Sequence, residues 1–274
     1  MATRRIPLTA KLKLQRSTVH YRALQAEIEN FFKPDVDPPV FNFEPGSDKG
    51  SIPIHFRIKK PLPLEWSVIV GDCLYNLRSA LDHIVSSLIL MHGGKLTNRN
   101  EFPIFFKRDN YFEIDTKGKP TGRIGGLTKV KGLPDGAATA IEALQPYNGK
   151  KWSPDLHPLW LLHELSNHDK HRLVNVVHAA ITSGYVSVSG LGHGKVERFT
   201  IPLGHLEDGT EVTRIRPMLG VRPESEVNVN FKFVPGVSFS PKGPGRGLPI
   251  LQTLRDIHTI IQDDILLALG PFVK

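Results

Sequence analysis

Apolar residues recur at helical spacing in four stretches of this chain. Residues 8–32, 65–91, 155–170 and 248–269 each carry apolar side chains every three or four positions with polar side chains between them. This spacing places the apolar groups on one face of a helix, where they can be buried. The four stretches therefore predict amphipathic helices that pack as a bundle.

Cap residues mark the ends of two of these helices. Gly93-Gly94 follows residues 65–91, and glycine commonly ends a helix. Ser153-Pro154-Asp155 combines a serine N-cap, a proline in the first position and an acid in the first turn. The third helix is therefore predicted to begin there.

The second half of the chain alternates in the manner of strands. Val227, Val229, Phe231 and Phe233 alternate with polar residues, as in a half-buried strand. Residues 196–203 and 211–216 predict a hairpin around Asp208-Gly209. Residues 52–60 predict an earlier strand, and the proline-rich residues 33–51 before it predict a loop.

Helices in the first half, antiparallel strands over 172–234 and a closing helix indicate the α+β class. We expect one domain covering residues 1–274, with the sheet against or beside the helical bundle.

The composition indicates the class of protein and the compartment in which it is expected. Of 274 residues, 40% are hydrophobic and 23% charged, which is ordinary for a globular protein. Cys73 is the only cysteine, which excludes an internal disulfide and fits a reducing compartment. The sequence shows no signal peptide, and no apolar run reaches the roughly 18 residues of a membrane span. A cytoplasmic protein without a membrane partner is expected.

The net charge of +8 favours acidic partners such as nucleic acid. The basic residues are spread along the chain, however, so solubility explains the charge equally well.

The helix over 65–91 has an unusual polar face. Asp72, Asn76, Ser79 and His83 share it, and Tyr75, Arg78 and Asp82 flank it. These side chains are mostly short and polar, where a solvent-facing stripe would be rich in Lys and Glu. The face is therefore predicted to be partly buried, in a site or an interface. Each residue taken alone is explained as well by structural hydrogen bonds, and Arg78 with Asp82 by an ordinary i, i+4 pair.

Arg78 and His83 form an Arg-x4-His motif, which resembles that of the HEPN superfamily of helical-bundle proteins. Many members are metal-independent ribonucleases in which the motif residues of two protomers meet at a dimer interface. The resemblance implies that His83 is the general acid/base and that Arg78 holds the scissile phosphate. Asp82, Asn76 and Ser79 would orient them.

A second resemblance covers more of the chain. Gly71 to His83, Gln145 to Tyr147 and Asn167 to Arg172 resemble motifs of a family of uncharacterised bacterial proteins. This family implies no activity.

A second polar cluster lies between His163 and Arg172. In the favoured interpretation, Asp169, Lys170, His171 and Arg172 end a helix and complement the first cluster, with His171 near His83. In a second, Glu164, His168 and His171 bind a divalent metal. In a third, His168-Asp169 is the dyad of an HD-type phosphohydrolase.

The sequence therefore predicts a homodimeric, HEPN-like metal-independent endoribonuclease or RNA-binding protein without a cofactor. The predicted catalytic residues are Arg78, His83, Asp82, Asn76 and His171. The predicted substrate-binding residues are Asp72, Ser79, Asp169, Lys170 and Arg172. The alternatives are a metal-dependent hydrolase or oxygenase that uses Glu164, His168 and His171, and a binding or scaffold module that is not an enzyme.

Overall fold

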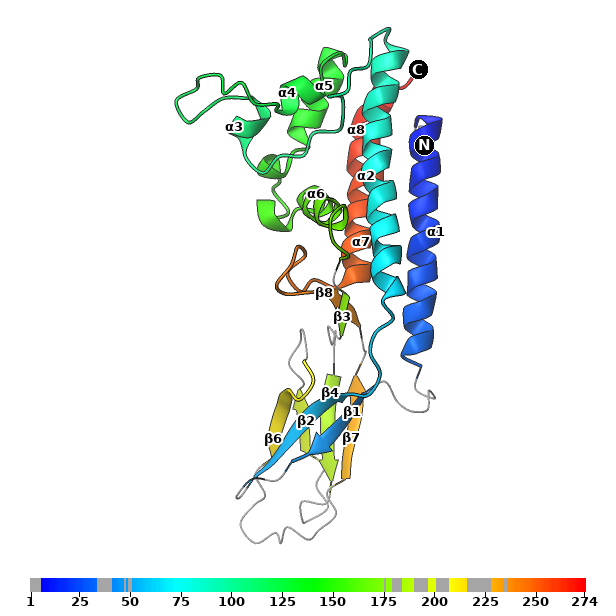
Figure 1. Cartoon of the computed structure of the whole chain (residues 1–274), viewed down its shortest axis with the longest axis vertical. Helices are drawn as coiled ribbons and strands as arrows, with labels where there is room; N and C mark the ends of the chain where they lie inside the picture. Colours follow the sequence, from blue (N-terminus) through cyan, green and yellow to red (C-terminus); the bar gives the residue numbers. More distant parts are fainter. Residues whose placement is uncertain are drawn as a thin grey trace. The chain divides into compact units, whose positions relative to one another are not determined.

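The chain has an α+β fold, as predicted (Figure 1). The structure is a computed structural model that describes residues 6–33, 41–46, 48, 51–174, 176–178, 184–189, 197–200, 207–215, 228–233 and 236–274. Its contacts divide the chain into two compact units. Unit 1 comprises Met1–Leu24, Ser67–Val174 and Leu251–Lys274, and unit 2 comprises Gln25–Trp66 and Asn175–Ile250. That the whole chain forms one domain stays a prediction.

The long helices supply the frame of unit 1. They are α1 (Leu8–Phe31), α2 (Glu65–Met91), α6 (Pro158–Asp169) and α7 (Ile250–Thr259). In Figure 1, α1 runs antiparallel to α2 and α7. Hydrogen bonds join α1 to both, because Ser17 Oγ donates to the Cys73 carbonyl at 3.2 Å and Thr18 Oγ1 lies 3.3 Å from His258 Nε2.

The apolar face predicted for residues 65–91 forms the core of unit 1. Its leucines and isoleucine are all buried to 1% exposure or less: Leu74, Leu77, Leu81, Ile84 and Leu88. The helix has the predicted bounds and ends before Gly93, whose positive φ of 78° suits glycine. This core fixes which side of α2 is left for polar contacts.

Shorter elements complete unit 1. They are α3 (Arg108–Tyr111), α4 (Gly126–Lys129), α5 (Asp135–Ala143), the 3₁₀ turns η1 (Pro146–Asn148) and η2 (Pro154–Leu156), the π-helical turn η3 (Ile260–Ile265), α8 (Leu266–Leu269) and the 3₁₀ turn η4 (Gly270–Phe272). The predicted last helix is therefore present but contains a π-helical segment. Apolar spacing did not predict that segment, because one inserted residue barely changes the pattern.

The predicted start of the third helix is wrong. Ser153-Pro154-Asp155 forms only the short turn η2, and Ser153 makes no side-chain cap. Helix α6 begins at Pro158, where His157 Nδ1 accepts a hydrogen bond from the Leu159 N–H at 3.3 Å. A helix that began at Pro154 would need an N–H at Pro158, and proline has none. Pro158 instead occupies the first position of α6, which suits it.

Unit 2 is built of small antiparallel sheets. Their strands are β1 (Phe41–Pro45), β2 (Ile52–Ile58), β3 (Val176–His178), β4 (Gly184–Ser189), β5 (Glu197–Thr200), β6 (Glu211–Ile215), β7 (Asn228–Phe233) and β8 (Val237–Phe239). They pair in the orders β1-β2-β6, β3-β8 and β5-β4-β7. The predicted strands over 52–60 and near residues 227–233 are confirmed, and Ile54 and Phe56 of β2 are fully buried.

Two predictions about unit 2 are wrong. Residues 41–45, expected in a loop, form β1 on β2, because their apolar and polar residues alternate despite the nearby prolines. The expected hairpin does not form, since β5 pairs with β4 and β6 pairs with β2. The turn at Asp208-Gly209 exists, but Gly209 donates to the Phe56 carbonyl at 2.8 Å, which directs the next strand to β2.

None of the helices in the described ranges combines the length and the apolar character that crossing a membrane requires.

Candidate functional site

The four residues of the predicted polar face on α2 do not gather in one place. Asn76 is buried, and its Nδ2 donates to the Asp72 carbonyl one turn earlier at 2.8 Å. The Asp72 side chain is 53% exposed and lies 3.9 Å from His20 Nδ1. His83 is half-buried and makes no hydrogen bond or ion pair within the described ranges. Of the four, Ser79 alone lines the pocket that is described below.

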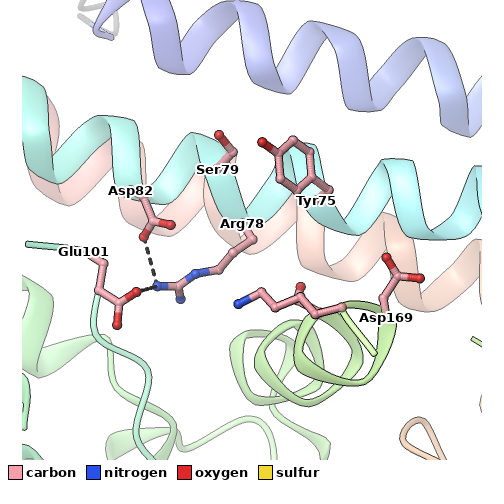
Figure 2. Close-up of a pocket in the computed structure, with 8 residues that line it drawn as sticks. Tyr75, Arg78, Ser79, Asp82, Glu101 and Asp169 are labelled. Carbon is pink, nitrogen blue, oxygen red and sulfur yellow. Dashed lines mark hydrogen bonds and ion pairs between the residues drawn. The ribbon is translucent and has the colours of Figure 1, made fainter. Parts of the chain in front are cut away.

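Arg78 is the centre of the polar contacts on α2. Its side chain is 13% exposed, and Nη2 donates to Asp82 Oδ1 at 2.9 Å and to the Phe102 carbonyl at 2.7 Å. Nη2 also lies 3.5 Å from Glu101 Oε2 (Figure 2). The other terminal nitrogen, Nη1, is buried and has no hydrogen-bond partner in the described part of the chain.

Asp82 completes a clamp on the segment that follows α2. Its Oδ1 accepts the Phe102 N–H at 2.9 Å, while Arg78 holds the carbonyl of the same residue. Burial raises the pKa of Asp82, although the charge of Arg78 opposes the shift. The i, i+4 pair expected from the sequence is therefore present, and it also anchors a loop.

Glu101 is neutralised on both of its oxygens. Its Oε1 lies 2.5 Å from Lys129 Nζ, and its Oε2 faces Arg78. Burial acts to raise the pKa of Glu101, but the hydrogen bond from Lys129 and the charges of Lys129, Arg78 and Lys170 outweigh it and hold the pKa below its usual value. Two carboxylates, Asp82 and Glu101, are thus balanced by two cations, Arg78 and Lys129.

Gln145, from one of the motifs, holds the next part of the same segment. It is fully buried, and its Nε2 donates to the Pro103 carbonyl at 2.9 Å and to the Ile141 carbonyl at 3.1 Å. Its Oε1 accepts the Phe105 N–H at 3.0 Å. Residues 101–105 are therefore held by side chains from α2 and from the end of α5.

A pocket of about 280 Å³ opens between α2, residue 101 and the end of α6 (Figure 2). Its lining residues are Tyr75, Arg78, Ser79, Asp82, Glu101, Ser166, Asp169 and Lys170. The volume lies near the lower end of the roughly 300–1,000 Å³ of small-molecule sites. Ser166 is buried, and its Oγ has no partner within the described residues.

Asp169 sits directly on the backbone of α2. A Cβ added at Gly71 would lie 2.6 Å from Asp169 Oδ1 and 2.7 Å from Oδ2, so a larger residue there would have to displace the Asp169 carboxylate. Burial and the charge of Asp72 raise the pKa of Asp169, against the opposing effect of His168. Within the described ranges, no cation and no hydrogen-bond donor engages this carboxylate. Figure 2 shows Asp169 on one side of Arg78 and Glu101 on the other.

The pocket brings together part of the predicted set. Arg78, Ser79, Asp82, Asp169 and Lys170 line it. The other predicted residues do not line it: Asp72, Asn76, His83, His171 and Arg172. Both His171 and Arg172 are exposed beyond the end of α6.

The alternative metal ligands gain no support from their placement. Glu164 and His171 are exposed, and His168 is half-buried. Among the residues that the structure describes, no three His, Cys, Asp or Glu side chains are grouped so that they could hold a metal ion.

Sequence reasoning did not select Glu101 or Ser166 and gave Tyr75 only a flanking position. Ser166 precedes Asp169 and Lys170 by three and four positions, so the helical face that carries them could have indicated it. Glu101 lies in a loop, where no periodicity places a side chain. Tyr75 is 62% exposed, with Lys13 Nζ 5.0 Å from its ring centroid.

His163 lies on α6, the helix that carries Ser166 and Asp169, and is neutral at pH 7. Its pKa is lowered to about 4, mainly by burial and further by the charges of Arg78 and Lys129. The ring stacks on Trp160, with centroids 5.2 Å apart, and Nε2 lies 3.1 Å from Asn167 Nδ2. His163 does not line the pocket.

No protein-family model, no curated protein and no solved structure matches the chain.

Proposed function

We propose that the chain is a cytoplasmic RNA-binding protein that takes a backbone phosphate in the pocket of Arg78, Ser166 and Lys170. One observation carries the proposal: Arg78 and Ser166 both line the pocket, and Arg78 Nη1 and Ser166 Oγ are buried without a hydrogen-bond partner in the described part of the chain. A buried donor without an acceptor costs roughly 1–3 kcal/mol. A phosphate offers several acceptor oxygens and would satisfy both groups at once.

Apart from Asp169, the charges around the pocket are compatible with an anion. Asp82 and Glu101 are balanced by Arg78 and Lys129, so they contribute little net field. Lys170 lines the pocket, and within the described residues the one hydrogen bond of its side chain is a long contact of 3.4 Å to Asn167 Oδ1. The net charge of +8 would assist the approach of RNA.

We propose further that the protein cleaves the RNA that it binds. His83 lies outside the pocket of its own chain. An acid/base role for His83 at a phosphate held by Arg78 would therefore use two copies of the chain, as the HEPN resemblance implies. Such a dimer would need no metal, because the histidine moves the proton and the arginine stabilises the developing charge.

Binding is tested with a fluorescent single-stranded RNA in EDTA over a range of salt concentrations. We expect Lys170→Gln to weaken binding several-fold and to reduce the slope of log K against log salt by about one. Ser166→Ala should weaken binding without changing that slope. Lys95→Gln, an exposed lysine outside the pocket, is the matched charge control. The absence of RNA binding by the parent protein, or identical salt curves for Lys170→Gln and the parent, would overturn the proposal.

Cleavage is tested on the same RNA in EDTA. We expect His83→Gln to lose cleavage and to retain binding. A mixture of His83→Gln with Arg78→Lys should recover part of the activity if the two residues act from different copies. A His83→Gln protein that cleaves like its parent would rule out this role and leave the binding proposal standing.

A further inference from the structure

Asp169 is the polar group of the pocket that the binding of a phosphate does not explain. It belongs to the lining, its carboxylate has no donor or cation within the described ranges, and a carboxylate there repels an anion. Its carboxylate lies close to Gly71 of α2, where an added Cβ would come within 2.6 Å of Oδ1. A ligand that places only a phosphate in this pocket would be repelled by the Asp169 carboxylate and would form no hydrogen bond with it.

We infer that Asp169 is a specificity-determining residue that accepts a hydrogen bond from a ribose hydroxyl and so selects RNA over DNA. This inference rests on the proposed function. The 2′-hydroxyl is the donor that RNA has and DNA lacks. A hydrogen bond to a charged carboxylate offsets the repulsion of the phosphate for RNA, whereas DNA meets the repulsion alone.

The lining residues provide both donors for a phosphate and an acceptor for a hydroxyl. Arg78, Ser166 and Lys170 supply donors for the phosphate, and Asp169 supplies an acceptor on the other side of Arg78 from Glu101 (Figure 2). A volume of about 280 Å³ has room for one phosphate with its sugar and not for a duplex. The exposed ring of Tyr75 offers a face on which the attached base can stack.

The test compares three oligonucleotides of one sequence on the parent protein and on Asp169→Asn. They are RNA, DNA and a 2′-fluoro RNA, which keeps the sugar pucker of RNA but has no hydroxyl to donate. For the parent protein we expect RNA to bind about tenfold more tightly than either of the others, which corresponds to about 1.4 kcal/mol.

For Asp169→Asn we expect this ratio to fall several-fold, with DNA and 2′-fluoro RNA binding more tightly than they bind the parent. The increase follows from removal of the repulsive charge, and it cannot come from a variant that merely fails to fold. Asp264→Asn makes the same charge change at an exposed position outside the pocket, and it should leave the ratio unchanged.

The failures of the two proposals can be told apart. An RNA-to-DNA ratio that is the same in the parent and in Asp169→Asn, with both binding RNA, overturns the role of Asp169 alone. If the parent protein prefers RNA to DNA but binds 2′-fluoro RNA as tightly as RNA, it recognises the sugar pucker and not the hydroxyl. That result also overturns the role of Asp169. A parent protein that binds no RNA overturns the proposed function, and this inference with it.

Discussion

Gln145 shows how one side chain can hold a loop in place. It is fully buried and makes two hydrogen bonds through Nε2 and one through Oε1 to backbone groups. Removal of the amide would strand the Phe105 N–H and the Pro103 carbonyl in the interior. The Gln-Pro-Tyr motif therefore has a structural explanation that needs no ligand.

We expect Gln145→Ala to lower the free energy of unfolding by roughly 3 kcal/mol, because buried polar groups lose their partners. Urea titration followed by circular dichroism measures the change. Gln252→Ala is the matched control, since Gln252 is exposed and its side chain donates to Asp256 Oδ1 on the same helix, and it should stay within about 0.5 kcal/mol of the parent. Equal effects of the two substitutions would contradict the role given to Gln145.

His157 couples stability to pH. It is buried and caps α6, and burial lowers its pKa to about 4. In the unfolded chain its pKa is about 6.5, so between these values the unfolded state binds more protons. The stability contributed by the neutral ring is complete above pH 6.5 and is lost as the pH falls toward 4.

We expect His157→Asn to reduce the loss of unfolding free energy between pH 7 and pH 5 by roughly 2 kcal/mol. Asparagine can still cap the helix but does not titrate. Urea unfolding of both proteins at the two pH values gives the difference. His171→Asn, at an exposed position, should leave the pH dependence as it is in the parent. A parallel dependence in His157→Asn and the parent would contradict the assignment.

At the scale of elements, Gly71 of α2 faces the Asp169 side chain at the end of α6, and an added Cβ would meet its carboxylate. Alanine at Gly71 would gain about 0.5–1 kcal/mol of helix stability, but its Cβ would overlap the Asp169 carboxylate. Overpacking of this kind costs roughly 1–3 kcal/mol, so the clash outweighs the gain. The glycine of the motif therefore serves the approach of the two helices.

We expect Gly71→Ala to destabilise the protein by about 1 kcal/mol, and we expect the sign to reverse in an Asp169→Ala background, where the clash is absent. Urea unfolding of the four proteins of this cycle measures the coupling. If Gly71→Ala has the same effect in both backgrounds, the carboxylate does not limit the approach.

The elements were predictable where the signals are local. Helix α2 has its predicted bounds because a broad apolar face and the Gly93-Gly94 stop agree. The start of α6 was missed because two proline signals lie four residues apart, and only the second is compatible with a continuous helix. The pairing of β6 with β2 joins strands more than 150 residues apart, which turn signals cannot indicate.

At the scale of the molecule, local sequence signals predicted the residues of the site on each helix but not how those helices meet. Arg78 and Asp82 were predictable as neighbours on one helix face, and Asp169 and Lys170 as a helix end. Their meeting around Glu101 depends on the path of residues 92–105 after α2, and that path is held by Asp82 and Gln145. Hydrophobic periodicity carries no information about such a loop. His83 was placed with Arg78 by their spacing along the chain, yet only Arg78 lines the pocket.

Whether the chain unfolds as one domain can be decided with one reporter in each unit. Cys73 in unit 1 is fully buried, and burial raises the pKa of its thiol to about 12, so it reacts only after unit 1 opens. Trp66 in unit 2 is buried and donates to Glu27 Oε2 at 2.9 Å. Trp66 lies at the boundary of unit 2, on α2, and once Trp152 and Trp160 are replaced by phenylalanine its fluorescence reports the contact of α2 with the part of α1 that belongs to unit 2.

We expect labelling of Cys73 by a maleimide pulse and the fluorescence of Trp66 to change at the same urea concentration. The reason is that α1 is one continuous helix with residues in both units, including Leu24 in unit 1 and Ile28 in unit 2, both buried. Because helix formation is cooperative, loss of the half in one unit removes support from the other half. The circular dichroism of the parent protein should follow the same curve. Separate midpoints for Cys73 and Trp66 would instead show two domains that unfold independently, each with its own core.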